Sequence, residues 1–432
     1  MSPPRIVITG MGAVTGFGFE WQSMWAQMLR GEHCIRPWQP EGVADGTFPV
    51  RYAAAVDSRL LPDYLQGHRA WQMPLEKRSR LGWVAASQAI TDSGLTREQL
   101  RDAAVLCASG APAHSIQDML LTVSSERDAP PAWRHLMARA DQVDADHSLR
   151  QSNDRLARVI ADDIGCEGPV VNISSACAGA SQAIGNAFQM IRRGEVEVAI
   201  AGGADSVLSL DTMTALYLLG AASSEQRWGT GLCRPFDRHR SGLVAGEGGG
   251  FVVLETLERA LARGAVPYAE VLGFGSSLDG YKVTAPDPQG RGAALAMQTA
   301  LDDAGIRPQQ VDLINAHGTS TPLNDAAETL AIKSVFAQGE HYRRLAVSAN
   351  KSQFGHLIAA AGAPELIVTA LACKHDRITP TLNLHDAADD CDLDYCAHQT
   401  VNRRVDVALS NSFGFGGLNT CLVLGKYQEH AQ

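Results

Sequence analysis

Cys177 has the surroundings that a cysteine nucleophile requires. It follows the apolar run 170–173 and three small residues, Ser174–Ala176. From Ala178 to Ile191 the apolar residues recur at helical spacing, so we predict a buried strand, a tight elbow and a helix that begins just after the thiol. The positive end of that helix favours the thiolate, but by less than about one pKa unit, so full activation needs another group. The alternative is a small buried cysteine that packs under the sheet.

Two histidines and a lysine with catalytic potential occur in the second part of the chain. His317 stands at the end of an apolar strand, in the sequence NAHGTSTPLND from position 315, and catalytic groups of α/β proteins collect at such strand ends. Lys351 and His356 lie in SANKSQFGHLIAAAG, which begins at position 348 and enters a helix of small residues. The alternative for His317 is a histidine whose hydrogen bonds are satisfied in a turn. The alternative for Lys351 is a solvated lysine. The position of Lys351 between a strand and a tightly packed helix favours the catalytic interpretation.

A glycine-rich segment near the C-terminus, NSFGFGGLN from position 411, surrounds Phe413 and Phe415. Glycines of this kind suit a flexible loop whose backbone N–H groups approach a ligand closely. A second glycine-rich segment, RIVITGMGAVTGFG from position 5, invites comparison with dinucleotide-binding loops. Thr15 stands where that pattern needs Gly or Ala, and no acidic residue follows at the expected distance. We therefore predict a strand and a tight strand-to-helix turn there, without a nucleotide.

Composition indicates a globular protein of 432 residues, of which 45 % are hydrophobic and 19 % are charged. The formal net charge of −10 argues against nucleic acid as the main partner. The N-terminal residues lack a signal-peptide pattern and no stretch is long enough for a membrane span, so we expect no membrane insertion. Nine scattered cysteines without a C-x-x-C pair favour a reducing, cytoplasmic location. The histidines and cysteines between positions 385 and 398 fit none of the usual zinc spacings, so we expect no metal.

The order of helical and strand patterns repeats along the chain. A helical pattern over 81–95, which ends in an Asp-x-Gly turn, precedes an apolar strand at 103–108. The same order, with the same turn, recurs at 293–304 and 311–316. Repetition of this kind indicates a duplicated α/β unit.

We therefore predict an α/β fold of two duplicated halves, residues 1–265 and 266–432. The first half is longer, and most of the excess lies in residues 111–163, which are polar, charged and only weakly periodic. A long insertion in a compact domain is usually functional, and we interpret this one as a lid or an interface element.

Five motifs occur together in an order that is typical of one family. They are SSACAGA around Cys177, AGGAD at 201–205, AHGTSTP around His317, NKSQFGH at 350–356 and NSFGFGG at 411–417. On these motifs the chain resembles the elongating type II β-ketoacyl-[acyl-carrier-protein] synthases of the thiolase superfamily over nearly its whole length. The resemblance implies a five-layer αβαβα fold, with which the predicted duplication agrees.

The resemblance also implies a role for each residue of the candidate site. Cys177 corresponds to the nucleophile that takes the acyl chain as a thioester. His317 and His356 correspond to the pair that drives malonyl decarboxylation and stabilises the enolate, and Lys351 to the lysine that fixes their network. Backbone N–H groups of Cys177 and Phe415 would form the oxyanion hole, and Phe415 would be the gate between acylation and condensation.

The substrate and the cofactors follow from the same resemblance. Thr319 and Thr321 match hydroxyls that contact pantetheine, and we expect Phe413 to contact substrate as well. The phosphopantetheine arm belongs to the acyl carrier protein substrate, so no metal or redox cofactor is expected. The family implies a homodimer, with a heterodimer that includes a chain-length-factor homologue as the alternative.

Acyl carrier protein is the partner that the resemblance implies, and it is acidic. Because this chain is itself net negative, long-range charge opposes their encounter, and docking would need a local basic patch. The candidates are Lys77, Arg78 and Arg80 at the start of a helix, and Arg227 in a later loop. The alternative is a solvated basic stretch without a partner.

Two departures from the family pattern affect the expected substrate. Leu418 replaces the usual threonine of the last motif, which bears on the pantetheine tunnel. The segment after Ser109 and Gly110 reads APAHSIQDM instead of the family's glycine-rich stretch, which bears on the acyl pocket. We expect elongation in fatty acid biosynthesis, and the alternative is a ketosynthase of a specialised polyketide or polyene pathway.

Other enzyme classes fit the sequence less well. A degradative thiolase would carry a second cysteine in the last glycine-rich loop, and an initiating synthase would pair the cysteine with one histidine and one asparagine. A chain-length partner subunit would lack the nucleophile, and a serine hydrolase would need a G-x-S-x-G elbow. The rival from another class is a non-catalytic acyl-binding scaffold, which malonyl decarboxylation by the protein would exclude.

Overall fold

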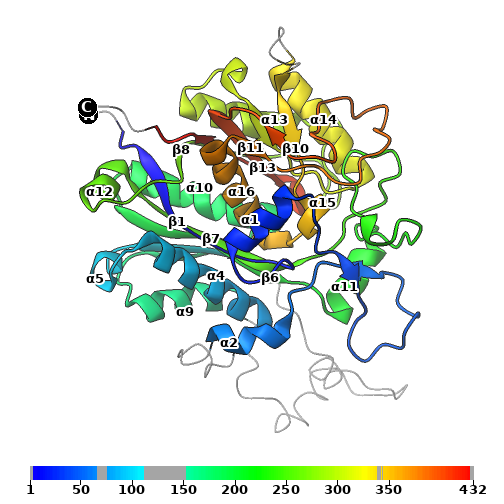
Figure 1. Ribbon diagram of the computed structural model, residues 1–432, viewed down its shortest axis with the longest axis horizontal. Coiled ribbons are helices and arrows are strands. Elements are labelled where there is room, and N and C mark those ends of the chain that lie inside the picture. The colour runs from blue at the N-terminus through cyan, green and yellow to red at the C-terminus, as the bar shows by residue number, and fades with distance from the viewer. Residues whose placement is uncertain (1–2, 66–74, 111–151, 338–341, 343, 429–432) are drawn as a thin grey trace.

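The computed structural model describes residues 3–65, 75–110, 152–337, 342 and 344–428. In this part of the chain ten strands form one sheet, in the order β10-β9-β13-β14-β8-β1-β7-β6-β4-β5 (Figure 1). Along the chain, the first five strands of this sheet are β1 (Ile6–Val14), β4 (Ala104–Ser109), β5 (Val170–Ile173), β6 (Val198–Ser206) and β7 (Glu247–Thr256). The second five are β8 (Ala269–Leu278), β9 (Leu313–Asn315), β10 (Ala346–Ser348), β13 (Val407–Gly414) and β14 (Leu418–Gly425).

The two sets of five strands have the same order. From the outside inwards the first set runs β5-β4-β6-β7-β1 and the second β10-β9-β13-β14-β8. Corresponding pairs also agree in direction, because β4–β5 and β9–β10 are parallel whereas β6–β7 and β13–β14 are antiparallel. Within the described part of the sheet, the sets join where Ile6–Ile8 of β1 pairs with Ala269–Val271 of β8. The predicted duplication is therefore present in the sheet.

Helices cover and separate the two sets of strands in five layers. The central layer contains α10 (Gly179–Arg192) and α16 (Gly362–His375), which pack against each other and against strands of both sets (Figure 1). On one outer face α4 (Lys77–Ser93) and α9 (Arg155–Ile164) cover the first set. On the other, α13 (Arg291–Ala304) covers the second set, and α14 (Pro322–Phe336) packs beside α13 in the same apolar cluster. The predicted αβαβα order is thus observed.

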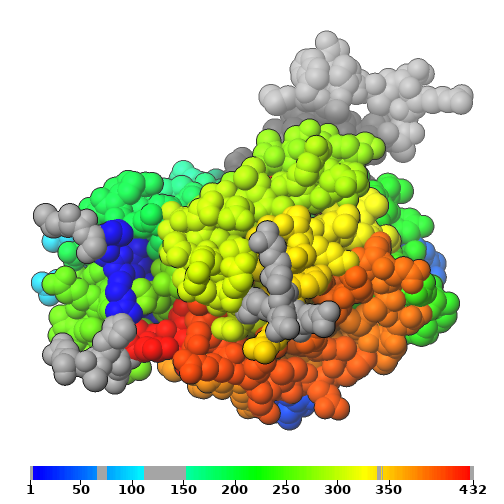
Figure 2. All heavy atoms as spheres, turned by 90° about the horizontal axis from the view of Figure 1, so that it is seen from above, coloured from blue at the N-terminus to red at the C-terminus, as the bar shows by residue number. Residues whose placement is uncertain are grey.

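Shorter elements complete the described chain. The helices are α1 (Trp21–Leu29), α2 (Leu61–Leu65), α5 (Arg97–Leu100), α11 (Leu210–Leu218), α12 (Leu257–Ala262) and α15 (Lys351–Phe354). The strands are β2 (Arg36–Pro37), β3 (Tyr52–Ala53), β11 (Arg377–Ile378) and β12 (Val401–Asn402). No helix among the described residues is both long enough and apolar enough to cross a bilayer. Seen from above (Figure 2), most of the visible face belongs to the second half of the chain, coloured yellow-green to orange.

The repeated Asp-x-Gly turns end two corresponding helices. Gly94 follows α4 with φ +68°, and Gly305 follows α13 with φ +65°. Both glycines are in the left-handed region, which glycine adopts without the steric cost that a Cβ imposes. The turn that marks the repeat in the sequence is therefore a helix C-cap used twice.

The glycine-rich segment near the N-terminus is a strand followed by a turn, as predicted, but the strand is longer than expected: a tight turn at Thr15–Gly18 leads from it to α1. Gly10 and Gly12 lie inside β1, which continues to Val14. A Cβ on Gly10 would lie 2.1 Å from the carbonyl oxygen of Ala89, and one on Gly12 would lie 2.0 Å from that of Ala85. Both oxygens belong to α4, so these glycines let a helix pack directly on the strand.

Two other predictions need correction. Val170 and Val171 were expected in a buried strand, but they are 42 % and 37 % exposed because β5 is the last strand of the sheet. Most of the insertion predicted for 111–163 lies outside the described residues, up to residue 151. Its end forms α9, whose Leu156 and Ile160 are buried against the outer face of the first set, so this part is not a lid.

Candidate active site

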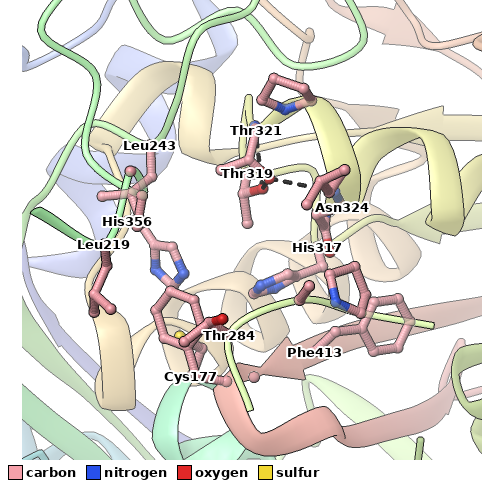
Figure 3. A pocket seen from close by; sticks show the side chains of 18 of the residues that line it. Cys177, Leu219, Leu243, Thr284, His317, Thr319, Thr321, Asn324, His356 and Phe413 are labelled. Carbon is pink, nitrogen blue, oxygen red and sulfur yellow. Dashed lines mark hydrogen bonds between the residues drawn. The ribbon is translucent and has the colours of Figure 1, made fainter. Parts of the chain in front are cut away.

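One cavity of about 340 Å³ brings together residues from both halves of the chain. Cys177, from the first half, lies at its base, and His317 and His356, from the second, point into it (Figure 3). Phe413 and Phe415 complete the wall next to the cysteine. The three polar groups are nearly inaccessible from bulk water, with exposures of 2–3 %. The structure therefore assembles the residues that the sequence predicted to act together.

The elbow that holds Cys177 is built from small residues. A 3₁₀ turn, Ala176–Ala178, follows β5 and leads into α10, which begins at Gly179 as predicted. Ala176 has φ +43°, a left-handed conformation that costs free energy in a residue with a Cβ. A Cβ on Gly179 would lie 2.9 Å from that of Ala108, so the turn sits tightly against β4. The sequence of small residues is what allows the thiol to stand at this strained corner.

Burial decides the charge of the thiol in this structure. It raises the pKa of Cys177 to about 11, although the nearby Lys351 ammonium and the backbone N–H of Phe415 both lower it. The expected preference for the thiolate at the helix N-terminus is therefore outweighed by desolvation. At neutral pH the cysteine is a thiol, and its proton must leave as the acyl group is transferred.

His317 is fixed through its backbone and its ring. Its backbone N–H donates to Glu328 Oε1 over 2.8 Å, and the next N–H, of Gly318, donates to Glu328 Oε2 over 2.8 Å. The ring nitrogen Nδ1 lies 3.2 Å from Lys351 Nζ, which donates to it when the amine is an ammonium. Burial, and then the charge of Lys351, hold the pKa of His317 well below its usual value. The imidazole is neutral, with its hydrogen on Nε2.

Lys351 is buried, which excludes the alternative of a solvated lysine. Its side chain is 0 % exposed, and Nζ also donates to the carbonyl oxygen of His317 over 2.7 Å and to Glu365 Oε1 over 2.6 Å. Burial raises the pKa of the Glu365 carboxyl to about 7, and the Lys351 ammonium opposes this effect. The lysine thus joins the histidine of one loop to a carboxylate of the central helix α16.

His356 has its own, separate anchor. The backbone N–H of Ile358 donates to His356 Nδ1 over 3.1 Å, so Nδ1 is the acceptor and the hydrogen is on Nε2. Burial is the main cause that holds the pKa of His356 well below its usual value. Its ring centroid lies 5.3 Å from that of His317, at an interplanar angle of 83°. Two neutral imidazoles therefore present N–H donors to one cavity.

The remaining predicted site residues also line this cavity. Thr319 Oγ1 and Thr321 Oγ1 lie 2.8 Å apart on one wall, and Thr321 accepts a hydrogen bond from the N–H of Asn324 as it caps α14 (Figure 3). The ring of Phe413 lies 5.8 Å from that of His317. Phe415 forms the wall on the side of the cysteine.

The predicted basic docking patch is wrong for Arg78. Its side chain is 3 % exposed, and its guanidinium donates to Glu76 over 2.9 Å and to the carbonyl oxygen of Gly110. Lys77 is ion-paired with Glu247, whose side chain is 1 % exposed. These cations belong to a partly buried network because α4 packs against β6 and β7 at this point. Charge reversal there would disturb the fold before it tested docking.

The other two docking candidates do not restore a patch. Arg80 is half-buried. Arg227 is exposed, but it stacks on Trp228 at 4.5 Å and lies 3.7 Å from Glu225. A basic surface for a carrier protein is therefore not formed by the four residues that the sequence suggested.

Three buried carboxylates of the site were missed in the sequence. Glu328 and Asp325, on α14, accept hydrogen bonds from the backbone N–H groups of the loop that carries His317. Glu365, on α16, pairs with Lys351. Each stands among small or apolar residues of a helix pattern, and a carboxylate at a core-facing helix position is a signal for a buried partner. That signal could have identified all three.

Comparisons with known proteins agree with this geometry. Residues 4–260 match the family described as "Beta-ketoacyl synthase, N-terminal domain", and residues 268–385 match "Beta-ketoacyl synthase, C-terminal domain". The chain is 36 % identical, over 430 residues and 98 % of both chains, to 3-oxoacyl-[acyl-carrier-protein] synthase 2 of Synechocystis sp..

Two solved structures are similar over nearly the whole chain. One is the ishigamide ketosynthase/chain length factor, with a TM-score of 0.85 and 31 % identity over 99 % of this chain and 100 % of that chain. The other is AntDE:AntF, a type II PKS acyl-carrier protein in complex with its ketosynthase, with a TM-score of 0.87 and 28 % identity over 99 % and 100 %. The layered fold, with a cysteine and two histidines in one cavity, defines a thiolase-like condensing enzyme. The chain belongs to the β-ketoacyl synthase family, and it is an acyltransferase.

Proposed function

We propose that Cys177 carries the growing acyl chain between two half-reactions. In the first, the sulfur attacks the carbonyl carbon of an acyl thioester on a carrier protein. A new C–S bond forms, the bond to the pantetheine sulfur breaks, and the thiol proton of Cys177 passes to the departing pantetheine thiol. The backbone N–H groups of Cys177 and Phe415 hold the carbonyl oxygen as it becomes negative; both already interact with the sulfur.

The second half-reaction uses the two histidines. A malonyl thioester loses CO₂, and the electron pair of the broken C–C bond forms an enolate, whose oxygen accepts hydrogen bonds from Nε2 of His317 and of His356. The enolate carbon attacks the acyl carbonyl on Cys177, a C–C bond forms, and the C–S bond breaks. The sulfur then takes a proton from solvent. Neutral imidazoles suit this task because they donate a hydrogen bond without releasing a proton.

The observation that carries the proposal is the convergence of a buried thiol and two neutral N–H donors in one cavity. Lys351 and the threonines Thr319 and Thr321 complete the assignment, as the holder of His317 and as contacts for pantetheine. The reaction needs no metal or redox cofactor, since the phosphopantetheine arm arrives with the substrate. Elongation in fatty acid biosynthesis is the first candidate, because the sequence relatives are 3-oxoacyl-[acyl-carrier-protein] synthases.

A specialised polyketide or polyene pathway is the second candidate. The ishigamide and AntDE structures favour it, as does Leu418, which stands where the family has a threonine. Leu418 pairs with Leu278, and the residues that follow these two, Asn419 and Asp279, line the cavity. The exposed edge of β5, with Val170 and Val171, is a template for pairing with a second chain. We propose a dimer formed there, either with a second copy or with a chain-length-factor homologue, in the cytoplasm.

Acylation by a panel of carrier-bound chains tests both candidates. We expect mass spectrometry to find the acyl group on the peptide that contains Cys177 after incubation with at least one chain class. Saturated chains as the best donors would support fatty acid elongation, and unsaturated or β-keto chains would support the polyketide pathway. Absence of acylation by every chain, in protein that is folded, would contradict the proposed function.

We propose that the carrier protein docks on an apolar rim around the mouth of this cavity, defined as Leu219, Val283 and Leu323. These side chains are 55 %, 75 % and 60 % exposed, and they come from three separate segments that all line the cavity. The nearby cation Arg240 is not available, because its side chain is 7 % exposed and donates to the carbonyl oxygen of Pro322 over 3.0 Å. Arg240 therefore does not restore the predicted basic patch, and we propose apolar contact as the main source of affinity.

Substitution in this rim should weaken docking selectively. We expect Leu323→Asp to raise the KM for acyl-carrier protein about tenfold, about 1.4 kcal/mol, because a charge replaces an apolar contact. The kcat with small acyl-pantetheine thioesters should stay unchanged. The matched control is Leu330→Asp, on the same helix and 41 % exposed but outside the cavity lining. Equal effects of the two substitutions in steady-state kinetics would place docking elsewhere.

A further inference from the structure

The turn after His356 is strained. Ile358 has φ +48°, the left-handed region that a β-branched residue adopts only when its surroundings hold it there. Its backbone N–H nevertheless donates to His356 Nδ1 over 3.1 Å, and this bond is what leaves the hydrogen of His356 on Nε2. The catalytic tautomer of His356 thus depends on a turn that would relax if nothing held it.

A carboxylate from the other half of the chain holds this turn. Asp205, near the end of β6, is 1 % exposed, and its Oδ2 accepts the backbone N–H of Ala359 over 3.0 Å. Ala359 directly follows the strained residue. The other oxygen, Oδ1, accepts the N–H of Ser206 over 2.9 Å, so the carboxylate is fixed to its own strand.

The backbone around Asp205 is shaped to admit the carboxylate. A Cβ on Gly110 would lie 2.2 Å from Asp205 Oδ2, so only glycine leaves room at the end of the neighbouring strand β4. Arg78, whose guanidinium donates to the Gly110 carbonyl oxygen, adds a positive charge close by. A buried carboxylate is costly unless it is hydrogen-bonded, and here its bonds go to the turn and to its own strand.

We propose that Asp205 is a positioning residue for His356, and this inference rests on the proposed function. By holding the N–H of Ala359, its carboxylate keeps the Ile358 turn in the left-handed conformation. The N–H of Ile358 then reaches His356 Nδ1, and Nε2–H faces the cavity where the enolate forms. Asp205 itself touches neither the substrate nor the reacting atoms.

Three variants test this role through malonyl decarboxylation. Asp205→Ala removes the acceptor, and we expect it to lower kcat about 10–100-fold with little change in KM, because one donor is misplaced rather than lost. Asp205→Asn keeps one of the two acceptor oxygens, which can still hold the N–H of Ala359, so its rate should fall less than that of Asp205→Ala. The double variant Asp205→Ala with Ile358→Gly should recover most of the loss, because glycine adopts φ +48° without strain.

A spectroscopic readout separates this role from general stability and from the proposed function. In ¹⁵N-histidine NMR spectra, His356 of the native protein and of Asp205→Asn should show the Nε2–H tautomer, and Asp205→Ala should show a mixture. Glu255→Ala is the control, because this buried carboxylate bonds Thr9 and Arg263 far from His356. It should lower the melting temperature and leave both the tautomer and kcat per folded protein unchanged.

The outcomes decide the proposal in every case. An unchanged tautomer and rate in folded Asp205→Ala would overturn it, and so would an Asp205→Asn variant that loses as much activity as Asp205→Ala. If Asp205→Ala does not fold, the double variant takes its place: native-like decarboxylation supports the proposal, and a rate at least 100-fold lower overturns it. If the native protein does not decarboxylate malonyl-carrier protein, the proposed function fails, while the tautomer test of Asp205 still stands.

Discussion

Cys177→Ala should abolish condensation, while Cys177→Gln should retain or increase malonyl decarboxylation. Among the described residues that line the cavity there is no second thiol, so no other group there is expected to hold the acyl chain. The histidines that stabilise the enolate are anchored by Lys351 and Ile358 and not by the cysteine. The two half-reactions therefore separate when the nucleophile alone is changed.

Product formation and CO₂ release, measured in parallel, check this prediction. Cys421→Ala is the matched control, because Cys421 is equally buried but lies outside the cavity lining. It should leave condensation intact. Condensation by Cys177→Ala at a rate close to that of the native protein would show that the acyl chain is held elsewhere.

His317→Ala and His356→Ala should each slow malonyl decarboxylation about 10²–10³-fold. Each substitution removes one of two N–H donors from the place where the enolate oxygen develops. Acyl transfer to Cys177 should suffer less, since its oxyanion is held by backbone N–H groups. His317→Ala should be the more damaging of the two for stability, because it removes the ring nitrogen that lies against the buried Lys351 ammonium. The backbone N–H that donates to Glu328 is kept.

Single-turnover acylation and steady-state decarboxylation distinguish the two steps. His375→Ala serves as the control, since this histidine lies at the end of α16 and does not line the cavity. Normal decarboxylation by both active-site variants would contradict the assigned roles. An equal loss in acylation and decarboxylation would point instead to a damaged fold, which circular dichroism would reveal.

The failure of the docking prediction shows what a linear pattern of charge omits. Lys77, Arg78 and Arg80 are dense in the sequence, and density alone suggested an exposed patch. In the structure their helix packs on the sheet. Lys77 forms an ion pair with Glu247, and Arg78 forms one with Glu76. Glu247 is 170 positions away from Lys77, so no local rule could have paired the two.

The sequence by itself determined the elements and the reacting groups. Hydrophobic spacing placed α10 directly after Cys177, and the repeated helix, turn and strand order predicted two similar halves. The residue types of Cys177, His317 and His356 identified the chemistry, because few other combinations can hold both an acyl chain and an enolate. These features are encoded locally, in a dozen neighbouring residues at a time.

Only the tertiary structure decided the state of those groups. The thiol of Cys177 is protonated because burial outweighs the helix dipole. Both histidines are neutral because burial, and then the charge of Lys351, lower their pKa. Burial depends on segments that are distant in the chain. The tautomer of His356 depends on a turn that Asp205, from the other half, holds in place. Desolvation and hydrogen bonding act through space and not along the sequence, so protonation and orientation appear only once the chain has folded.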